Sequence, residues 1–159
     1  MSRRLRLLAG TAAAALAAVA ALATAAAAAA PVTAHDAARA RLQYLQYCSG
    51  CHLADGSGSP VYGIPVMRGM LGRFLHVSGG REYIVQVPGV MNSPLSDADI
   101  ANLMNWLLPT VSAATLPAEV APYTAAEIAR LRLDRPLDVM ARRAALVERM
   151  GDAGATAPR

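Results

Sequence analysis

Apolar residues recur at intervals of three and four in most segments of this sequence, which is the period of an α-helix. The clearest case lies between residues 96 and 109, where the apolar positions are Ile100, Leu103, Met104, Trp106 and Leu107. Ser96 is a good N-cap, and Asp97 and Asp99 suit the positive end of a helix. We predict a helix that begins after Ser96 and ends just before Pro109.

Shorter helices and one loop are predicted ahead of that segment. Residues 35–47 carry apolar or aromatic residues at helical spacing, namely Ala40, Tyr44 and Tyr47. Residues 53–65 contain three glycines and two prolines, which indicates a turn-rich loop. Short helical pieces are expected from about residue 70 to 77, and residues 83–87 form a short β-prone stretch.

Beyond the predicted helix the composition changes twice. Up to Pro122 it is dominated by Thr, Ser, Ala and prolines, which indicates a linker over residues 110–123. Thr124 and Glu127 then form a capping-box pattern ahead of one helix, and a second helix is predicted after Pro136. The apolar face of this second helix is formed by Leu137, Met140, Ala144 and Val147. On or near its opposite face lie Arg142, Arg143 and Arg149.

The predicted elements give an all-α fold class. A helical domain occupies residues 35–109, and the linker at 110–123 joins it to a helical C-terminal extension at 124–159. No internal repeat and no alternating strand pattern is visible, so a single core is expected.

Residues 1–34 have the organisation of a secretory signal peptide. Three arginines near the start precede an uncharged run rich in Leu and Ala, and small residues suited to cleavage follow between residues 24 and 34. The uncharged run is long enough for the roughly 20 residues that span a bilayer, so an uncleaved membrane anchor is the alternative. We expect cleavage, because alanine gives little apolar drive, and we expect the mature protein in the periplasm.

The net charge of +4 overstates the basic character of the mature protein. All 15 basic residues are arginines, and three of them lie in the predicted signal, which leaves 12 against 11 acidic residues and a net charge of +1. A nucleic-acid-binding protein would show a clustered basic stripe, and none is present. The charge therefore does not reveal a partner surface.

Only two cysteines occur, in the run Cys48-Ser49-Gly50-Cys51-His52. Two thiols three positions apart lie on one helical turn, where they can add to the two vinyl groups of a haem while the adjacent imidazole reaches the iron. Ser49 and Gly50 are small enough to let the porphyrin edge approach. Free thiols of an exported chain are exposed to oxidation, so these two must be bonded to something.

Three other uses of the cysteine motif are alternatives. A thioredoxin-type redox pair should follow a strand in a βαβ unit, whereas this pair follows a predicted helix. A zinc site needs four ligands, so the motif would have to recruit His35 or His76, and neither has the spacing of a zinc finger. A short-loop disulfide explains neither His52 nor its surroundings. The pattern together with export favours covalent attachment of haem c through Cys48 and Cys51.

The sequence resembles the class I cytochrome c family over about residues 36–109. Tyr44 lies where that family has an aromatic residue four positions before the first cysteine, and Ala40 lies where it usually has glycine. The segment Leu95-Ser96-Asp97, with Ile100 and Trp106 after it, is similar to the closing helix of the family. The resemblance implies that the first and closing helices of this domain cross.

Two loop segments extend the resemblance and imply a role for Pro65. Residues 55–58, Asp-Gly-Ser-Gly, are similar to the turn after the haem histidine, and residues 64–69 are similar to the G-x-P-x-L-x-G segment. In that family the proline carbonyl accepts a hydrogen bond from the ligand histidine and fixes its tautomer. By the same resemblance Met67, at the leucine position, is expected to pack against haem.

The resemblance also implies the axial ligands of the haem iron. His52 is the first ligand, and the family takes the second from a methionine in the loop before the closing helix, where Met91 is the candidate. Asn92 stands where a proline usually follows that methionine. The alternatives to Met91 are an open sixth position and three further side chains, His76, Met70 and Met104.

The function implied by the resemblance is that of a periplasmic single-haem electron carrier and not an enzyme. Its partners would be redox proteins, with a dehydrogenase-type donor and an oxidase or reductase as acceptor. An open sixth position would instead make it a haem gas sensor or a peroxidase-like protein. The extension at 124–159 suggests a further alternative, a haem subunit of a larger oxidoreductase, if it docks on a partner and not on its own domain.

Overall fold

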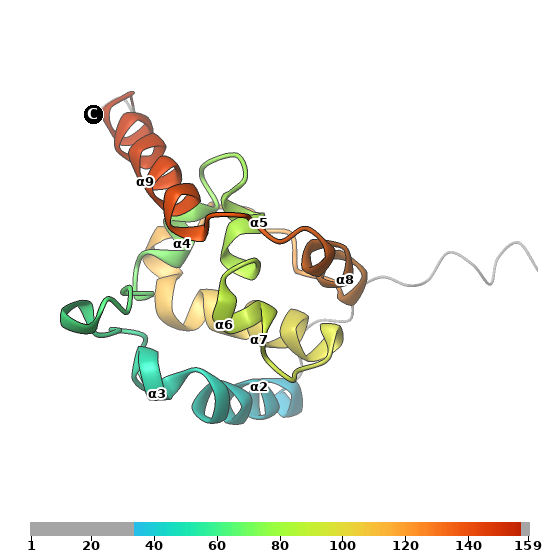
Figure 1. Cartoon of the computed structure of the whole chain (residues 1–159). Helices are drawn as coiled ribbons and strands as arrows, with labels where there is room; N and C mark the ends of the chain where they lie inside the picture. The colour runs from blue at the N-terminus through green and yellow to red at the C-terminus, as the bar shows by residue number, and fades with distance from the viewer. Residues whose placement is uncertain (1–33, 157–159) are drawn as a thin grey trace, which may run out of the picture. The chain divides into compact units, whose positions relative to one another are not determined.

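The computed structural model of the chain describes residues 34–156, and within them it is built from helices (Figure 1). The α-helices are α2 (Ala34–Tyr47), α3 (Ser49–His52), α4 (Leu71–Phe74), α5 (Gly80–Val85), α6 (Pro88–Met91), α7 (Asp97–Ser112), α8 (Ala125–Leu133) and α9 (Val139–Thr156). Single 3-10 turns lie at Pro60–Tyr62 and Ala113–Thr115, and the described residues form one isolated β-bridge but no strand. The all-α prediction is confirmed.

The predicted signal peptide lies, apart from Ala34, outside the described residues. In the part of the chain that the structure describes, no helix is both long and apolar enough to cross a membrane.

The centre of the fold is the packing of α2 against α7, which lie beside each other in Figure 1. Ala40 is fully buried in α2, and the Tyr44 ring lies 5.9 Å from the Trp106 ring, centroid to centroid. The Asn102 side chain of α7 donates to the Asp36 carbonyl of α2 at 2.9 Å. A small residue at position 40 lets the two backbones approach, as the resemblance implied.

Both predicted N-caps are present. Ser96 Oγ accepts from the Asp99 backbone N–H, and Thr124 Oγ1 accepts from that of Glu127, each at 3.1 Å. The Glu127 side chain does not reach back to complete a capping box. It accepts instead from the Arg81 guanidinium of α5 at 2.7 and 2.8 Å, so the cap also ties α8 to the body of the protein.

The predicted end of the long helix was wrong, because α7 continues through Pro109 to Ser112. Proline removes one backbone donor from a helix interior, so the last turn needs support from elsewhere. The Val111 carbonyl accepts from the Gly69 backbone N–H at 2.8 Å, and Ser112 Oγ donates to the Met67 carbonyl at 3.2 Å. The loop ahead of α4 therefore holds the final turn of α7.

The β-prone stretch at residues 83–87 is largely helical, since α5 extends to Val85. The chain enters α5 through Gly79, whose φ of +83° favours glycine, and a Cβ on Gly80 would lie 1.9 Å from the Phe74 carbonyl oxygen. This close turn starts a short helix whose Tyr83, Ile84 and Val85 are all buried. Burial in the core outweighs the weak preference of these residues for strands.

The C-terminal extension packs on its own domain. Helix α8 contacts α5 and α7, and its Ile128 and Leu131 are 0% and 4% exposed. Gln86 Nε2, at the end of α5, donates to the Asp134 carbonyl at 2.6 Å. The sequence left open whether the apolar face of this extension meets its own domain or a partner, and α8 meets its own domain.

The apolar face predicted for the last helix was wrong. Leu137 is fully exposed, Met140 is 69% exposed and Val147 is 36% exposed, whereas Leu146 is buried at 1%. Helix α9 packs against α4 and α5 through a different face, formed by Val139, Arg142, Arg143, Leu146 and Met150. Long arginine stems can cover apolar surface, so the face that carries the arginines is not necessarily the exposed one.

We predict that α8 contributes to the stability of the whole domain. Ile128→Ala removes a fully buried side chain, and we expect a loss of about 2–5 kcal/mol in the free energy of unfolding, measured with denaturant. Leu133→Ala, in the same helix at 89% exposure, is the matched control and should change that free energy by about 0.5 kcal/mol or less. Equal effects of the two variants would contradict the packing of α8 on the domain.

Candidate cofactor site

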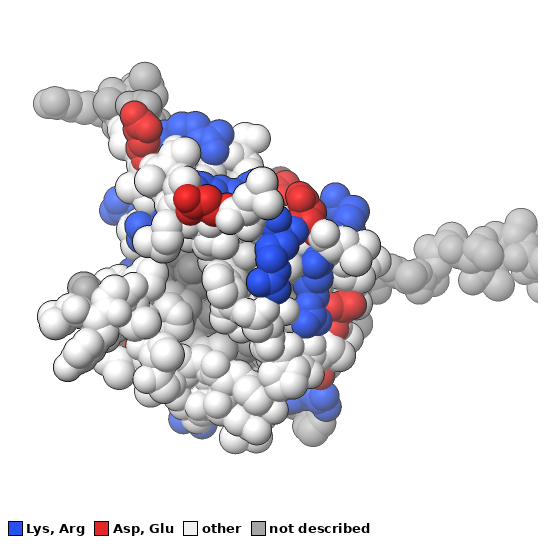
Figure 2. Space-filling view, viewed as in Figure 1, with Lys and Arg blue, Asp and Glu red and all other residues white. Residues whose placement is uncertain are grey.

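A mainly apolar cavity of about 400 Å³ lies next to the cysteine motif. Its volume is in the range of roughly 300–1,000 Å³ that holds small molecules and cofactors. Helices α2 to α7 and α9 all contribute side chains to its wall. Figure 2 shows the hollow, with mostly uncharged residues around it.

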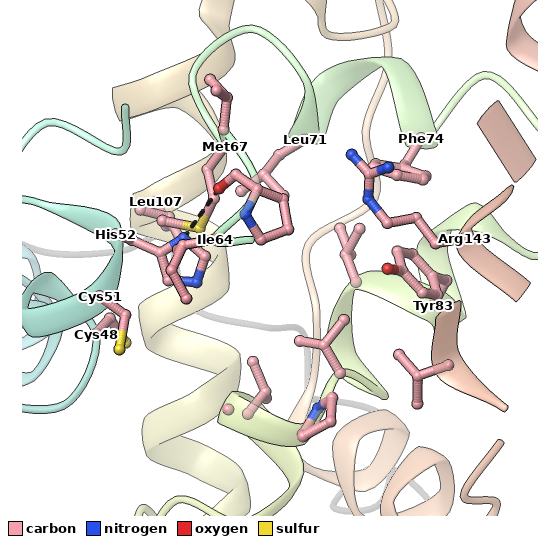
Figure 3. Close-up of a pocket in the computed structure, with 18 of the residues that line it drawn as sticks. Cys48, Cys51, His52, Ile64, Met67, Leu71, Phe74, Tyr83, Leu107 and Arg143 are labelled. Carbon is pink, nitrogen blue, oxygen red and sulfur yellow. Dashed lines mark hydrogen bonds between the residues drawn. The ribbon is translucent and has the colours of Figure 1, made fainter. Parts of the chain in front are cut away.

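The cysteine motif forms one wall of this cavity, and Figure 3 shows Cys48, Cys51 and His52 together on that side. The backbone N–H groups of Cys51 and His52 both donate to the Cys48 carbonyl, at 3.2 and 3.0 Å, which closes a single helical turn. Both cysteines are free thiols. Cys48 is the more buried of the two, and burial raises the pKa of its thiol.

The His52 ring is oriented by Pro65, as the resemblance implied. His52 Nδ1 lies 3.2 Å from the Pro65 carbonyl oxygen, the contact drawn as a dashed line in Figure 3. A carbonyl oxygen only accepts hydrogen bonds, so Nδ1 is the nitrogen that donates. The lone pair of Nε2 is then available to a metal.

Gly58 brings the Pro65 carbonyl to His52. Its φ is +64°, its backbone N–H donates to the His52 carbonyl at 3.0 Å, and a Cβ on it would lie 2.5 Å from the Pro65 oxygen. Ser59 and Ile64 exchange two backbone hydrogen bonds, at 3.1 and 3.0 Å, which close the loop between them. The predicted turn-rich loop therefore folds back on the histidine, and only glycine fits at its base.

Comparison with known proteins gives two related sequences. Both are named cytochrome c-552, one from Thermus thermophilus and one from a particular strain of that species, and each is 31% identical to this chain over 116 residues. The match covers 60% of this chain and 88% and 78% of the two relatives. The chain belongs to the cytochrome c family. No family model and no solved structure matches it.

Membership of the cytochrome c family makes haem c, with its iron, the cofactor of this chain, and electron transfer its general activity. The cavity fits that group. Cys48 and Cys51 lie at its wall beside a histidine whose Nε2 is free for iron, and the rest of the lining is mainly apolar, as a porphyrin requires. These residues would hold haem through two thioether bonds and one axial bond.

The segment after the histidine is fixed to the first helix of the cytochrome by Tyr44. Its hydroxyl donates to the Leu53 carbonyl at 2.6 Å, and Leu53 itself has a φ of +60°, which is strained for a leucine. Burial raises the pKa of Tyr44 to about 12, so the hydroxyl remains a donor even at a pH where an exposed tyrosine would lose its proton. The aromatic position four residues before Cys48 therefore has a structural task at the site.

The methionines are distributed differently from the sequence-based expectation. Met91 is 7% exposed and is not among the residues that line the cavity, although Val90 before it is. The methionines that do line the cavity are Met67, Met104 and Met140. His76 lies outside the lining, with Nε2 3.0 Å from the Thr115 carbonyl. Met91 as the sixth ligand of iron stays a prediction.

One lining residue was missed by the sequence analysis. Arg143 of α9 lines the cavity, and Figure 3 shows its side chain beside Phe74 and Tyr83, across from His52. The helical pattern placed Arg143 on the exposed face of the last helix. No local signal could have found it, because the side of α9 that faces the domain is decided by packing against α4 and α5.

We predict that Gly58 is needed for the His52–Pro65 hydrogen bond and not only for the turn. Gly58→Ala should lower stability by more than the roughly 1–3 kcal/mol that a positive φ costs a non-glycine residue, because its Cβ would displace the Pro65 carbonyl. A weaker hydrogen bond makes the imidazole a poorer donor to iron, which disfavours the ferric state, so the midpoint potential of the haem protein should rise.

Gly63→Ala is the matched control, since Gly63 has a φ of +73° and open space around its Cβ position. It should show the stability loss of a positive φ without the change in potential. Equal potentials in the two variants would show that Gly58 does not position the carbonyl.

Proposed function

We propose that this cytochrome c is an exported single-haem electron carrier that binds haem through Cys48 and Cys51 and ligates its iron through His52. The observation that carries the proposal is the His52 ring, which donates from Nδ1 to the Pro65 carbonyl and sits with both cysteines at the wall of an apolar cavity. When bound, haem c supplies exchange of single electrons. The protein supplies attachment, orientation and exclusion of water.

The apolar wall sets the electrostatics of the carrier. A cavity lined mainly by aliphatic and aromatic side chains is a poor solvent for charge, so it favours the less charged ferrous state and a high potential. The hydrogen bond from His52 acts in the opposite direction, because it strengthens the imidazole as a ligand to ferric iron. The balance of these two effects suits a carrier with a defined potential.

The uncharged surface around the hollow supports docking with redox partners there. Next to the residues that line the cavity, Val61 and Tyr62 are 90% and 83% exposed. Figure 2 shows uncharged residues to the left of the hollow and below it, while the charged side chains gather above it and to its right. A dehydrogenase-type donor and an oxidase or reductase acceptor would meet this surface in turn, with little help from charge.

Export to the periplasm is proposed from the sequence of residues 1–34, which lies outside the described structure apart from Ala34. The basic start, the uncharged run and the small residues that follow support a cleaved signal. Thioether bonds between haem and both cysteines would also resolve the problem of two free thiols in an oxidising compartment.

We propose Met91 as the sixth ligand, on its position before the closing helix. For its thioether to meet the iron, α6 would have to turn Met91 toward the cavity, where Val90 now lies. That placement favours a second candidate function. If the sixth position stays open behind an apolar wall, the cytochrome would bind small gases at its iron instead of only passing electrons.

Visible spectra of the haem-loaded protein distinguish the two functions. With Met91 bound, the oxidised protein should show the weak long-wavelength band of a thioether on ferric haem, and the reduced protein should not bind carbon monoxide. Met91→Ala should lose the band and bind carbon monoxide. Met140→Ala, which removes a cavity-lining methionine, is the control and should keep both properties. A high-spin wild type that binds carbon monoxide directly would establish the open site.

The docking surface is tested by electron self-exchange between oxidised and reduced copies of the protein, measured by NMR line broadening. Val61→Asp adds a like charge to both copies at an uncharged contact and should slow exchange several-fold at low salt, with recovery at high salt. Leu133→Asp, at an exposed position of α8 that does not line the cavity, adds the same charge and should leave the rate unchanged. Equal rates in both variants would contradict docking through Val61.

A further inference from the structure

The cavity contains one arginine and no carboxylate. Among the described residues that line it, Arg143 is the single Arg, Lys, Asp or Glu, and every other lining residue except His52 is apolar, a cysteine or a tyrosine. Arg143 is half-buried, on the side of the cavity that Figure 3 shows across from His52. A guanidinium in such a place loses hydration and gains no anion in return.

The described chain has three other half-buried arginines, of which two form ion pairs and the third, Arg142, has its guanidinium at the Gly79 carbonyl. Arg81 is paired with Glu127 and Arg132 with Asp97, at 2.7 and 2.9 Å. No ion pair is formed by Arg143 with any described carboxylate. Unlike Arg142, Arg143 lines the cavity, so its guanidinium, which has no carboxylate partner in the described protein, lies where a cofactor would be.

Haem carries two carboxylate side chains on an otherwise apolar ring. A guanidinium is the side chain best suited to bind a carboxylate, because it offers parallel donors in a planar fork. We propose that Arg143 binds a haem carboxylate, which makes the C-terminal helix α9 part of the haem site. This inference rests on the proposed attachment of haem in this cavity.

The position of Arg143 is fixed by the residues around it on α9. Asp138 Oδ1 accepts from the Ala141 backbone N–H at 2.8 Å, which caps the start of the helix, and Leu146 is 1% exposed one turn beyond Arg143. Val139 and Met140 line the same cavity. Helix α9 thus places the apolar side chains of Val139 and Met140 and the cation of Arg143 next to one another at the cavity. This combination suits the porphyrin ring of haem, which is apolar and carries carboxylates at its edge.

Through Arg143, the C-terminal extension would then help to set the midpoint potential of the haem. Removing a cation beside a haem carboxylate leaves the anion uncompensated, and an uncompensated anion stabilises ferric over ferrous iron. Arg143→Met keeps most of the apolar stem and removes the charge, so the midpoint potential should fall. Arg143→Lys keeps the charge and should restore much of the wild-type potential. Arg149→Met, on an exposed part of the same helix, should leave it unchanged.

The potentials are measured by spectroelectrochemical titration of the haem-loaded proteins, after covalent haem has been confirmed by denaturing gel. A fall in potential in Arg143→Met that Arg143→Lys reverses is the expected result. An unchanged potential in Arg143→Met, or a fall of the same size in Arg143→Lys, would overturn the inference while leaving the haem site intact. Absence of covalent haem in the wild type would instead reject the proposed function itself.

Discussion

The hydrogen bond from His52 Nδ1 to the Pro65 carbonyl is the constraint around which this site is built. It requires a loop that returns to the histidine within thirteen residues, and that loop closes because Gly58 adopts a positive φ against the Pro65 oxygen. The same bond fixes which imidazole nitrogen is free for iron. The orientation of the histidine and the shape of the loop therefore depend on each other.

The ion pairs of the described domain lie outside the residues that line the cavity. Four arginines of the described domain pair with carboxylates, among them Arg39 with Asp99 and Arg81 with Glu127. Tyr123, in the linker, is 2% exposed, donates to the Arg81 carbonyl and lies under its guanidinium, which joins linker, α5 and α8. Arg143 has no described carboxylate as partner, and the haem carboxylate proposed above would supply one.

The residues after α7 are part of the packed domain. Helix α8 fills part of the core, and α9 covers the cavity edge opposite the histidine. This arrangement links the stability of the extension to the properties of the cofactor site.

The sequence by itself indicated the cysteine motif, the turn-rich loop and the caps at Ser96 and Thr124, because each involves residues close together in the chain. The Pro65 contact and the packing of α2 on α7 were expected from the resemblance to a known family. Tertiary packing alone decided the continuation of α7 past Pro109, the helical form of residues 83–85, the buried face of α9 and the methionines that line the cavity. Those features depend on which surface is buried, and the spacing of apolar residues and arginines along a helix is compatible with more than one buried face.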